Sequence, residues 1–95
     1  MDCTWYVYMM ADHPGGLLYI GITNDLFRRV EEHKNGAIDS FTKHYQMYRL
    51  VYYETYSTPY DAIIREKQLK HWDRAWKIRL IKTGNPFWKD LSDEF

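Results

Sequence analysis

The sequence predicts an α+β domain with a three-stranded, mainly antiparallel sheet flanked by helices. Two aromatic and β-branched runs, at 4–10 and 17–23, are separated by a turn segment that contains Pro14 and a glycine pair, as in a hairpin. A third run of the same kind lies at 48–56. Helix-capping residues precede the segments that follow the second and third strands. The predicted order is therefore strand, strand, helix, strand, helix, helix.

The chain opens with the hairpin. TWYVYMM at 4–10 predicts the first strand, ADHPGG at 11–16 the turn, and LLYIGIT at 17–23 the return strand. Tyr8 and Tyr19 then lie on paired strands, where tyrosines usually pack.

The first helix is predicted over about 25–35. Asn24 or Asp25 serves as its N-cap, and Gly36 ends it. The following AIDSFTKHYQM has no clear period and is expected to form a loop.

Two further helices are expected after the strand YRLVYYETY. Thr58 caps the first of these, Pro59 occupies its first position, and it ends near Trp72. Asp73 can cap the last helix, which ends near Thr83-Gly84. In the tail NPFWKDLSDEF, the apolar residues are expected to pack and SDEF to fray.

Composition favours one globular domain over 1–95, with a core from about 4 to 91. Aromatic residues make up 18% of the chain and supply much of the burial that a small core needs. Cys3 is the only cysteine, so no intramolecular disulfide can form. The start MDCTWYVYMM lacks the basic residues of a secretion signal, and no apolar run could span a bilayer. We therefore expect a soluble cytoplasmic protein without a membrane partner.

The charges are unevenly distributed although the formal net charge is zero. Residues 65–82 contain seven lysines and arginines against two acids. Such a basic stripe can follow a phosphate backbone, but charge alone favours the simpler interpretation of a solvated helix face. The candidate nucleic-acid-binding residues in the stripe are Lys67, Lys70, Arg74 and Lys77.

Helical geometry separates two neighbouring arginines. With Leu26 at zero and roughly 100° per residue, Val30, His33 and Arg29 fall near about 40°, −20° and −60°. His33 and Arg29 therefore lie on the apolar side of the first helix, whereas Arg28 points to solvent. Burying two polar side chains unpaired is costly, so this pair is either internally satisfied or functional.

Two further residues are candidates for a site. Glu66 lies among apolar neighbours of the helix after Pro59, so its carboxylate needs Lys70 at i+4, an arginine or a metal ion. Gly21 lies on the same sheet face as Tyr19, and a glycine within a strand often permits close approach of another group.

These residues together resemble the GIY-YIG nuclease family. The resemblance rests on YVY at 6–8, YIG at 19–21, Arg29, His33, Glu66 and Asn85, and covers nearly the whole chain. It is strongest to small stand-alone bacterial members, in the segments YVYMM, YIGITNDLFRRVEEH, LVYYE and AIIREKQLKHW. The sequence departs from the family pattern where Tyr6 and Val7 replace glycine and isoleucine, and His44 cannot be aligned to a family histidine.

The resemblance implies an endonuclease that hydrolyses DNA phosphodiester bonds and acts in DNA repair or recombination. It implies one divalent metal, Mg²⁺ or Mn²⁺, held by Glu66, with Arg29 clamping the phosphate. Tyr8 or Tyr19 would take the proton from water, and His33 would orient that tyrosine or relay the proton. Gly21 and Asn85 would support the site.

Substrate choice stays open at this point. A chain of 95 residues leaves no room for a separate DNA-binding domain. Weak sequence preference, a structure-selective substrate, or a protein partner that supplies specificity are all compatible with it, and RNA is not excluded. The alternative to a nuclease is a non-catalytic nucleic-acid-binding module of the same fold, with the basic stripe and surface tyrosines as its contacts.

Overall fold

The computed structural model describes residues 3–36 and 45–95. Its centre is a three-stranded sheet made of β1 (Trp5–Ala11), β2 (Leu18–Thr23) and β3 (Arg49–Tyr56). The strand order is β2-β1-β3, and both pairings are antiparallel. The predicted fold class is confirmed, with the first strand at the centre of the sheet.

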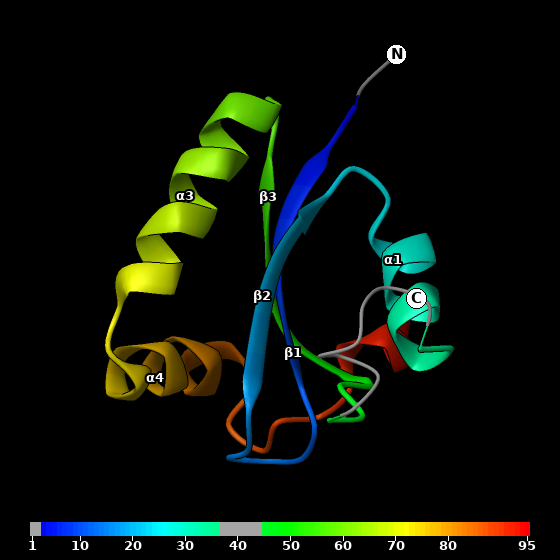
Figure 1. Cartoon of the computed structure of the whole chain (residues 1–95), viewed down its shortest axis with the longest axis vertical. Helices are drawn as coiled ribbons and strands as arrows, with labels where there is room; N and C mark the ends of the chain where they lie inside the picture. Colours follow the sequence, from blue (N-terminus) through cyan, green and yellow to red (C-terminus); the bar gives the residue numbers. More distant parts are fainter. Residues whose placement is uncertain (1–2, 37–44) are drawn as a thin grey trace.

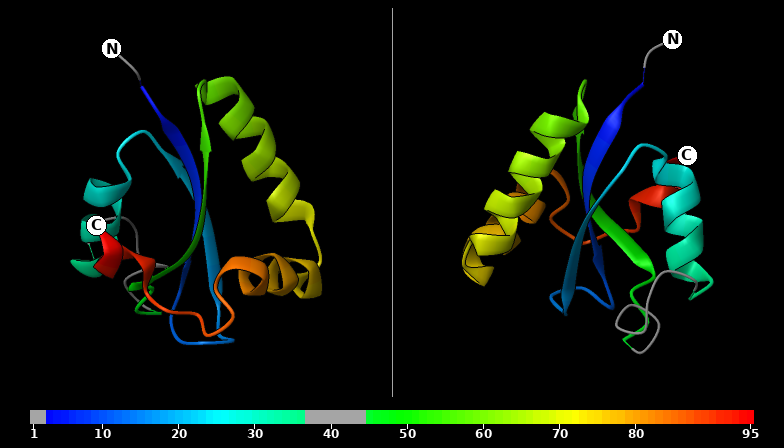
Figure 2. Two further views of the ribbon diagram at one scale, coloured as in Figure 1. Left: turned by 180° about the vertical axis from the view of Figure 1, so that it is seen from behind. Right: turned by 45° about the horizontal axis from the view of Figure 1, so that its top comes forward.

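Helices cover both faces of this sheet (Figure 1). α1 (Leu26–Lys34) packs on one face, whereas α3 (Pro59–His71) and α4 (Arg74–Gly84) lie on the other. A short 3₁₀ helix, η1 (Leu91–Glu94), brings the end of the chain back to the α1 side, as both views of Figure 2 show. The sheet therefore separates the helix that carries Arg29 from the helix that carries Glu66.

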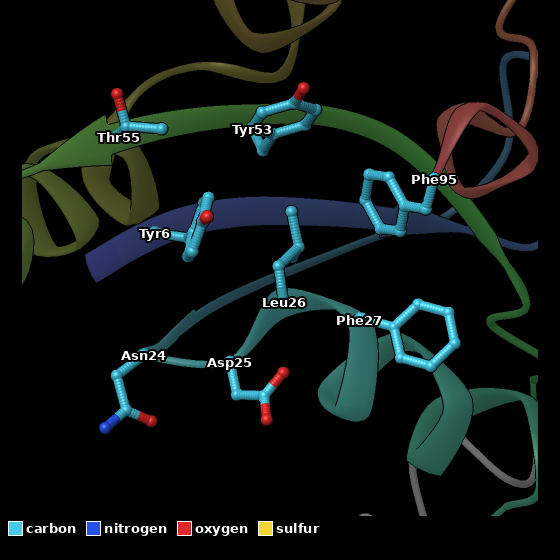
Figure 3. A pocket seen from close by; sticks show the side chains of 8 residues that line it. All are labelled: Tyr6, Asn24, Asp25, Leu26, Phe27, Tyr53, Thr55 and Phe95. Atoms are coloured by element: carbon cyan, nitrogen blue, oxygen red, sulfur yellow. The ribbon is translucent and has the colours of Figure 1, made fainter. Parts of the chain in front are cut away.

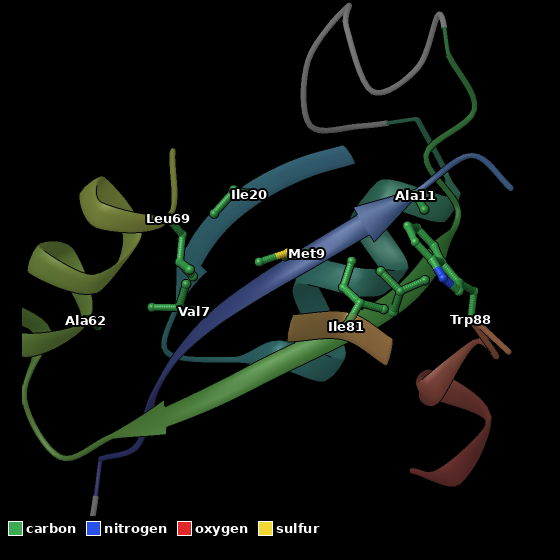
Figure 4. Close-up of a cluster of buried hydrophobic side chains, with 9 residues drawn as sticks. Val7, Met9, Ala11, Ile20, Ala62, Leu69, Ile81 and Trp88 are labelled. Carbon is green, nitrogen blue, oxygen red and sulfur yellow. The ribbon is translucent and has the colours of Figure 1, made fainter. Parts of the chain in front are cut away.

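Strand alternation divides the core into two layers, because successive side chains of a strand point to opposite faces. The α3–α4 side holds Val7, Met9 and Ala11 of β1, packed with Leu69 and Ile81 of the two helices (Figure 4). The α1 side is a second buried cluster, made of Tyr8, Met10, Leu26, Val30, Met47 and Leu50.

A bulge between Met9 and Met10 shifts the register of β1 against β3. At this bulge β3 contains one residue more than the facing part of β1. Two successive residues of β3, Val51 and Tyr52, therefore both pack on the α3–α4 side. Beyond the bulge, Tyr53 pairs with Tyr8 and joins the α1 side of the sheet.

Two of the predicted caps are present. The carboxylate of Asp25 accepts the backbone N–H of Arg28 at 3.1 Å, and the Thr58 hydroxyl accepts that of Asp61 at 3.2 Å. Asp73 occupies the third cap position, but its side chain makes no capping hydrogen bond, so this part of the prediction was wrong.

The tail also differs from the prediction, because SDEF belongs to η1 and the residue that follows it. The turn is fixed by the carboxylate of Asp90, which accepts both the backbone N–H and the hydroxyl of Ser92. Most of the predicted loop after α1, including His44, lies outside the described residues. Over 3–36 and 45–95, no helix is long and apolar enough to cross a membrane.

Candidate active site

Two tyrosines and a histidine meet on the α1 side of the sheet. The hydroxyl of Tyr8, on β1, lies 2.9 Å from Nε2 of His33, on α1. The ring of Tyr19, on β2, lies 5.1 Å from the His33 ring and 6.3 Å from that of Tyr8. Tyr8 and His33 are fully buried, whereas Tyr19 is half-buried. The sequence therefore brings three of its predicted site residues into direct contact.

Gly21 makes room for this cluster. It lies directly opposite Tyr8 in the β1–β2 ladder. A Cβ at position 21 would lie 2.5 Å from the Tyr8 hydroxyl oxygen and 2.6 Å from Cζ, closer than real Cβ contacts. The absence of a side chain at Gly21 thus allows the phenol to lie across β2 and reach the histidine.

Arg29 lies one turn before His33 on the same helix. Its guanidinium pairs with Glu32 at 3.4 Å, and about a third of its side chain is exposed. It also lines a small hollow of about 130 Å³ together with Thr23, Asn24, Asp25, Arg28 and Glu32. Arg29 therefore joins the buried cluster to the surface.

The environment holds the Tyr8 phenol in its neutral form. Burial raises the pKa of Tyr8 well above its ordinary value, and the nearby Tyr19 raises it further. The charge of Arg29 and its hydrogen bond to Tyr8 lower the pKa in part without overcoming burial. Tyr8 therefore keeps its hydroxyl proton at neutral pH, and the tautomer of His33 decides which partner donates in the hydrogen bond between them.

Glu66 lies on the other side of the sheet, on α3. Its carboxylate pairs with Lys70 at 3.4 Å, and only 16% of its side chain is exposed. With the buried Ala62 at zero, Arg65 falls near about −60° and Glu66 near about +40°. Arg65 contacts β3. Glu66 must therefore flank the opposite side of the helix, toward the edge strand β2.

Asn85 supports the backbone at a distance from the tyrosine cluster. Its amide donates to the carbonyls of Val51 and Lys89 at 3.1 and 2.8 Å, and its oxygen accepts the Lys89 N–H at 2.9 Å. It therefore ties the segment after α4 to β3.

The predicted basic residues lie on α3 and α4. Lys67 and Arg74 are exposed, and Lys77 is half-buried. Lys70 pairs with Glu66. Arg74 donates to the carbonyls of Gly15 and Gly16, both at 2.6 Å, and so holds the hairpin turn against α4.

One half-buried ion-pair network was not predicted from the sequence. Arg65 binds the carboxylate of Glu54 through Nε at 2.9 Å and Nη2 at 3.0 Å, and Glu54 also accepts the hydroxyls of Tyr52 and Tyr56. Arg65 further stacks on Trp72, 4.9 Å from its ring centre. The period-two pattern Tyr-x-Glu-x-Tyr in β3 is the sequence signal that could have revealed it.

Comparisons with known proteins show the family of this chain. A model described as the GIY-YIG catalytic domain matches residues 4–79. The chain belongs to the GIY-YIG family. Within that family, a UPF0213 protein of Staphylococcus epidermidis is 37% identical over 79 residues, which cover 83% of this chain and 95% of the relative. A UPF0213 protein of Staphylococcus aureus is 39% identical over 77 residues, covering 81% of this chain and 93% of the relative.

A solved structure supports the fold of this GIY-YIG domain. The solution NMR structure of a UPF0213 protein from Bacillus halodurans has a TM-score of 0.57 and 26% sequence identity. The match covers 92% of both chains. These relatives are small bacterial proteins, as the sequence resemblance predicted.

Proposed function

We propose that this GIY-YIG protein is a metal-dependent endonuclease that hydrolyses DNA phosphodiester bonds. The observation that carries the proposal is the meeting of Tyr8, Tyr19 and His33 above Gly21, with Arg29 at the surface end of the cluster. A purely structural core has little use for three hydrogen-bonding rings on one sheet face.

The residues fit a single hard cation. No group of three metal-ligating side chains occurs in residues 3–36 and 45–95, which disfavours an all-protein cage. Glu66 offers one largely buried carboxylate whose partner, Lys70, is half-exposed and easily displaced. Mg²⁺ typically takes one or two carboxylates and fills its other positions with water and substrate phosphate. When bound, Mg²⁺ or Mn²⁺ would neutralise charge on the scissile phosphate and the leaving oxygen.

Arg29 is proposed to bind the scissile phosphate from the α1 side of the sheet, with the Glu66-bound metal ion reaching the same phosphate around the edge strand β2. Its guanidinium is always charged and presents planar N–H donors that match phosphate oxygens. The weak pair with Glu32, at 3.4 Å, can be exchanged for a phosphate. Charge that develops on the phosphoryl oxygens would then be stabilised by a donor already in place.

The proton relay is proposed to run through Tyr19 and His33. Tyr8 stays neutral, and its hydrogen bond with Nε2 holds the His33 ring in one orientation. Tyr19 contacts the same ring and is the less buried tyrosine, which gives its hydroxyl better access to water. Tyr19 would therefore pass its own hydroxyl proton to the ring of His33 as it takes the proton of the attacking water, while Tyr8 positions the histidine.

Nicking of supercoiled plasmid DNA tests the proposal. The wild-type protein should nick DNA with Mg²⁺ or Mn²⁺ and not with EDTA, and Glu66→Gln should reduce the rate about 100-fold or more. Glu31→Gln is the matched control, because Glu31 is exposed on α1. The proposal fails if micromolar wild-type protein leaves supercoiled, single-stranded and branched DNA intact with both metals.

A non-catalytic DNA- or RNA-binding module is the second candidate. It is favoured by the positive charge of α3 and α4 and by Trp76, which is exposed beside Arg79. Phosphate contacts of this kind give salt-sensitive binding. Such a module would bind nucleic acid equally well in Glu66→Gln and would show no metal-dependent cleavage. As part of the nuclease function, we also propose that the protein acts in DNA repair, is cytoplasmic and obtains specificity from a protein partner.

A further inference from the structure

An aromatic groove lies on the α1 side of the sheet, beside the tyrosine–histidine cluster. It encloses about 420 Å³. Its walls come from β1, the turn between β2 and α1, α1 itself, β3 and Phe95, as Figure 3 shows. The lining residues that matter here are Tyr6, Phe27, Tyr53, Thr55 and Phe95.

Four aromatic rings in the groove contact one another in pairs. Tyr53 lies 6.1 Å from Tyr6 and 6.4 Å from Phe95, and Phe27 lies 6.3 Å from Phe95, all measured between ring centres. The Phe27 side chain is nevertheless 61% exposed. Rings arranged in this way present open faces to the groove and are not sealed within the core.

The groove adjoins the arginine hollow described above. Asn24 and Asp25 line both spaces, so an extended ligand could occupy the two together. The acids of the hollow are already engaged: Asp25 accepts the Arg28 N–H, and Glu32 pairs with Arg29. The side chain of Arg28 is exposed and has no carboxylate partner in the described part of the chain. Arg28 can therefore bind an anion at this hollow.

We propose that this groove binds an unpaired base of the DNA strand whose phosphate lies at Arg28 and Arg29. The inference takes its substrate class from the proposed function. A nucleobase has two flat faces that stack on aromatic rings, and its edge needs hydrogen-bonding groups such as the Asn24 amide and the Thr55 hydroxyl. Bases inside a duplex are stacked on both faces, so only an unpaired or extruded base can enter.

This arrangement favours DNA structure over sequence, because the Asn24 amide and the Thr55 hydroxyl can each donate and accept and so can bond the edge of any base. Stacking accepts every base, because every base has an aromatic face. The phosphate contact is equally independent of sequence. Single-stranded gaps, flaps and branch points would therefore be bound in preference to intact duplex.

The test uses 2-aminopurine, whose fluorescence is quenched by stacking, placed at the unpaired position of a gapped DNA duplex. Titration with the wild-type chain in EDTA should quench the signal, and Phe27→Ala should weaken binding about tenfold. Tyr60→Ala is the matched control, because Tyr60 is an exposed aromatic residue on α3, outside the groove. It should bind like the wild type.

The proposal is overturned if fully paired duplex competes as well as gapped DNA, or if Phe27→Ala and Tyr60→Ala bind equally. It is also overturned if sedimentation shows a dimer that Phe27→Ala dissociates, since a second copy would then occupy the groove. Because EDTA prevents cleavage, binding and nicking are scored separately. Quenching without nicking would support base binding in the groove and contradict the proposed nuclease activity. Nicking without quenching would support the nuclease activity and contradict base binding in the groove.

Discussion

The Tyr8 hydroxyl lies 2.9 Å from Nε2 of His33, and neither side chain is exposed to solvent. This contact joins the central strand of the sheet to α1 at the point where Tyr19 also meets the histidine. The same bond thus fixes the helix on the sheet and the orientation of the imidazole. Its strength depends on the phenol keeping its proton, which burial favours.

Removal of the Tyr8 hydroxyl should change the response of the protein to alkaline pH. The folded-state pKa of Tyr8 is raised, so its stabilising effect is complete below about pH 10 and is lost as the pH rises toward that raised pKa. Tyr8→Phe should lower the unfolding free energy by about 1 kcal/mol at neutral pH. Above about pH 10, the unfolding free energy of the variant should fall less steeply with pH than that of the wild type. Urea denaturation from about pH 7 to 11 measures both effects.

Tyr56 provides the internal reference for this experiment. Its pKa is raised to about 12 by partial burial and by the hydrogen bond to Glu54, and Tyr8→Phe leaves that site unchanged. Some alkaline destabilisation should therefore remain in the variant. An unchanged pH profile in Tyr8→Phe would show that the Tyr8 hydroxyl titrates normally.

Gly21→Ala adds only one methyl group but should disrupt the site strongly. The added methyl would meet the Tyr8 phenol, which is held by the histidine, so the ring or β2 must shift. We expect a loss of about 1–3 kcal/mol in unfolding free energy together with a loss of the proposed nuclease activity. Gly84→Ala is the control, because nothing lies within 4 Å of the corresponding Cβ. Equal stability of the two variants in urea would contradict the close approach at Gly21.

Much of the cluster could be predicted from the sequence because local periodicity determines it. The helical period placed His33 on the buried side of α1 and Arg29 at its margin, and the structure has them there. Strand alternation put Tyr19 and Gly21 on the same face, whereas the register that places Gly21 opposite Tyr8 is known only from the structure. Each of the predicted relationships spans a single element or one tight turn.

Features that depend on distant contacts could not be predicted in the same way. The bulge between Met9 and Met10 reflects pairing with a strand about forty residues away, and it has no local signal. Aspartate is a residue type that often caps helices, yet the side chain of Asp73 makes no capping hydrogen bond. Arg74 looked like a surface cation, whereas the fold brings the hairpin turn within its reach. The charge of a residue and its secondary-structure propensity do not predict contacts with residues far away in the sequence.

Acid should weaken the attachment of α3 to the sheet through Glu54. Burial alone would raise the pKa of Glu54, but hydrogen bonds from Arg65, Tyr52 and Tyr56 outweigh it and hold the pKa below its usual value. The stabilising effect is therefore complete above about pH 4.5 and is lost as the pH falls through the lowered pKa. Glu54→Gln should lower the unfolding free energy by about 2 kcal/mol at neutral pH.

The difference between Glu54→Gln and the wild type should shrink at about pH 3, where the wild-type carboxylate is increasingly protonated. Urea denaturation at the two pH values provides the comparison. Glu31→Gln, at an exposed position, should show no such change. A constant difference between the wild type and Glu54→Gln across this range would mean that the Glu54 charge does not stabilise the fold.

Substitutions at Arg74 and Lys77 should separate stability from nucleic-acid binding on the basic helices. Arg74→Ala removes two hydrogen bonds to the hairpin turn and should lower the unfolding free energy by about 1–2 kcal/mol. Lys77→Ala, on the same helix, lacks such contacts and should leave stability within about 0.5 kcal/mol of the wild type. If Lys77 contacts phosphate, the variant should bind DNA more weakly and with a salt dependence reduced by about one phosphate contact. Urea denaturation combined with binding at several salt concentrations measures both. Equal stability of Arg74→Ala and wild type would show that the hairpin turn does not need this arginine.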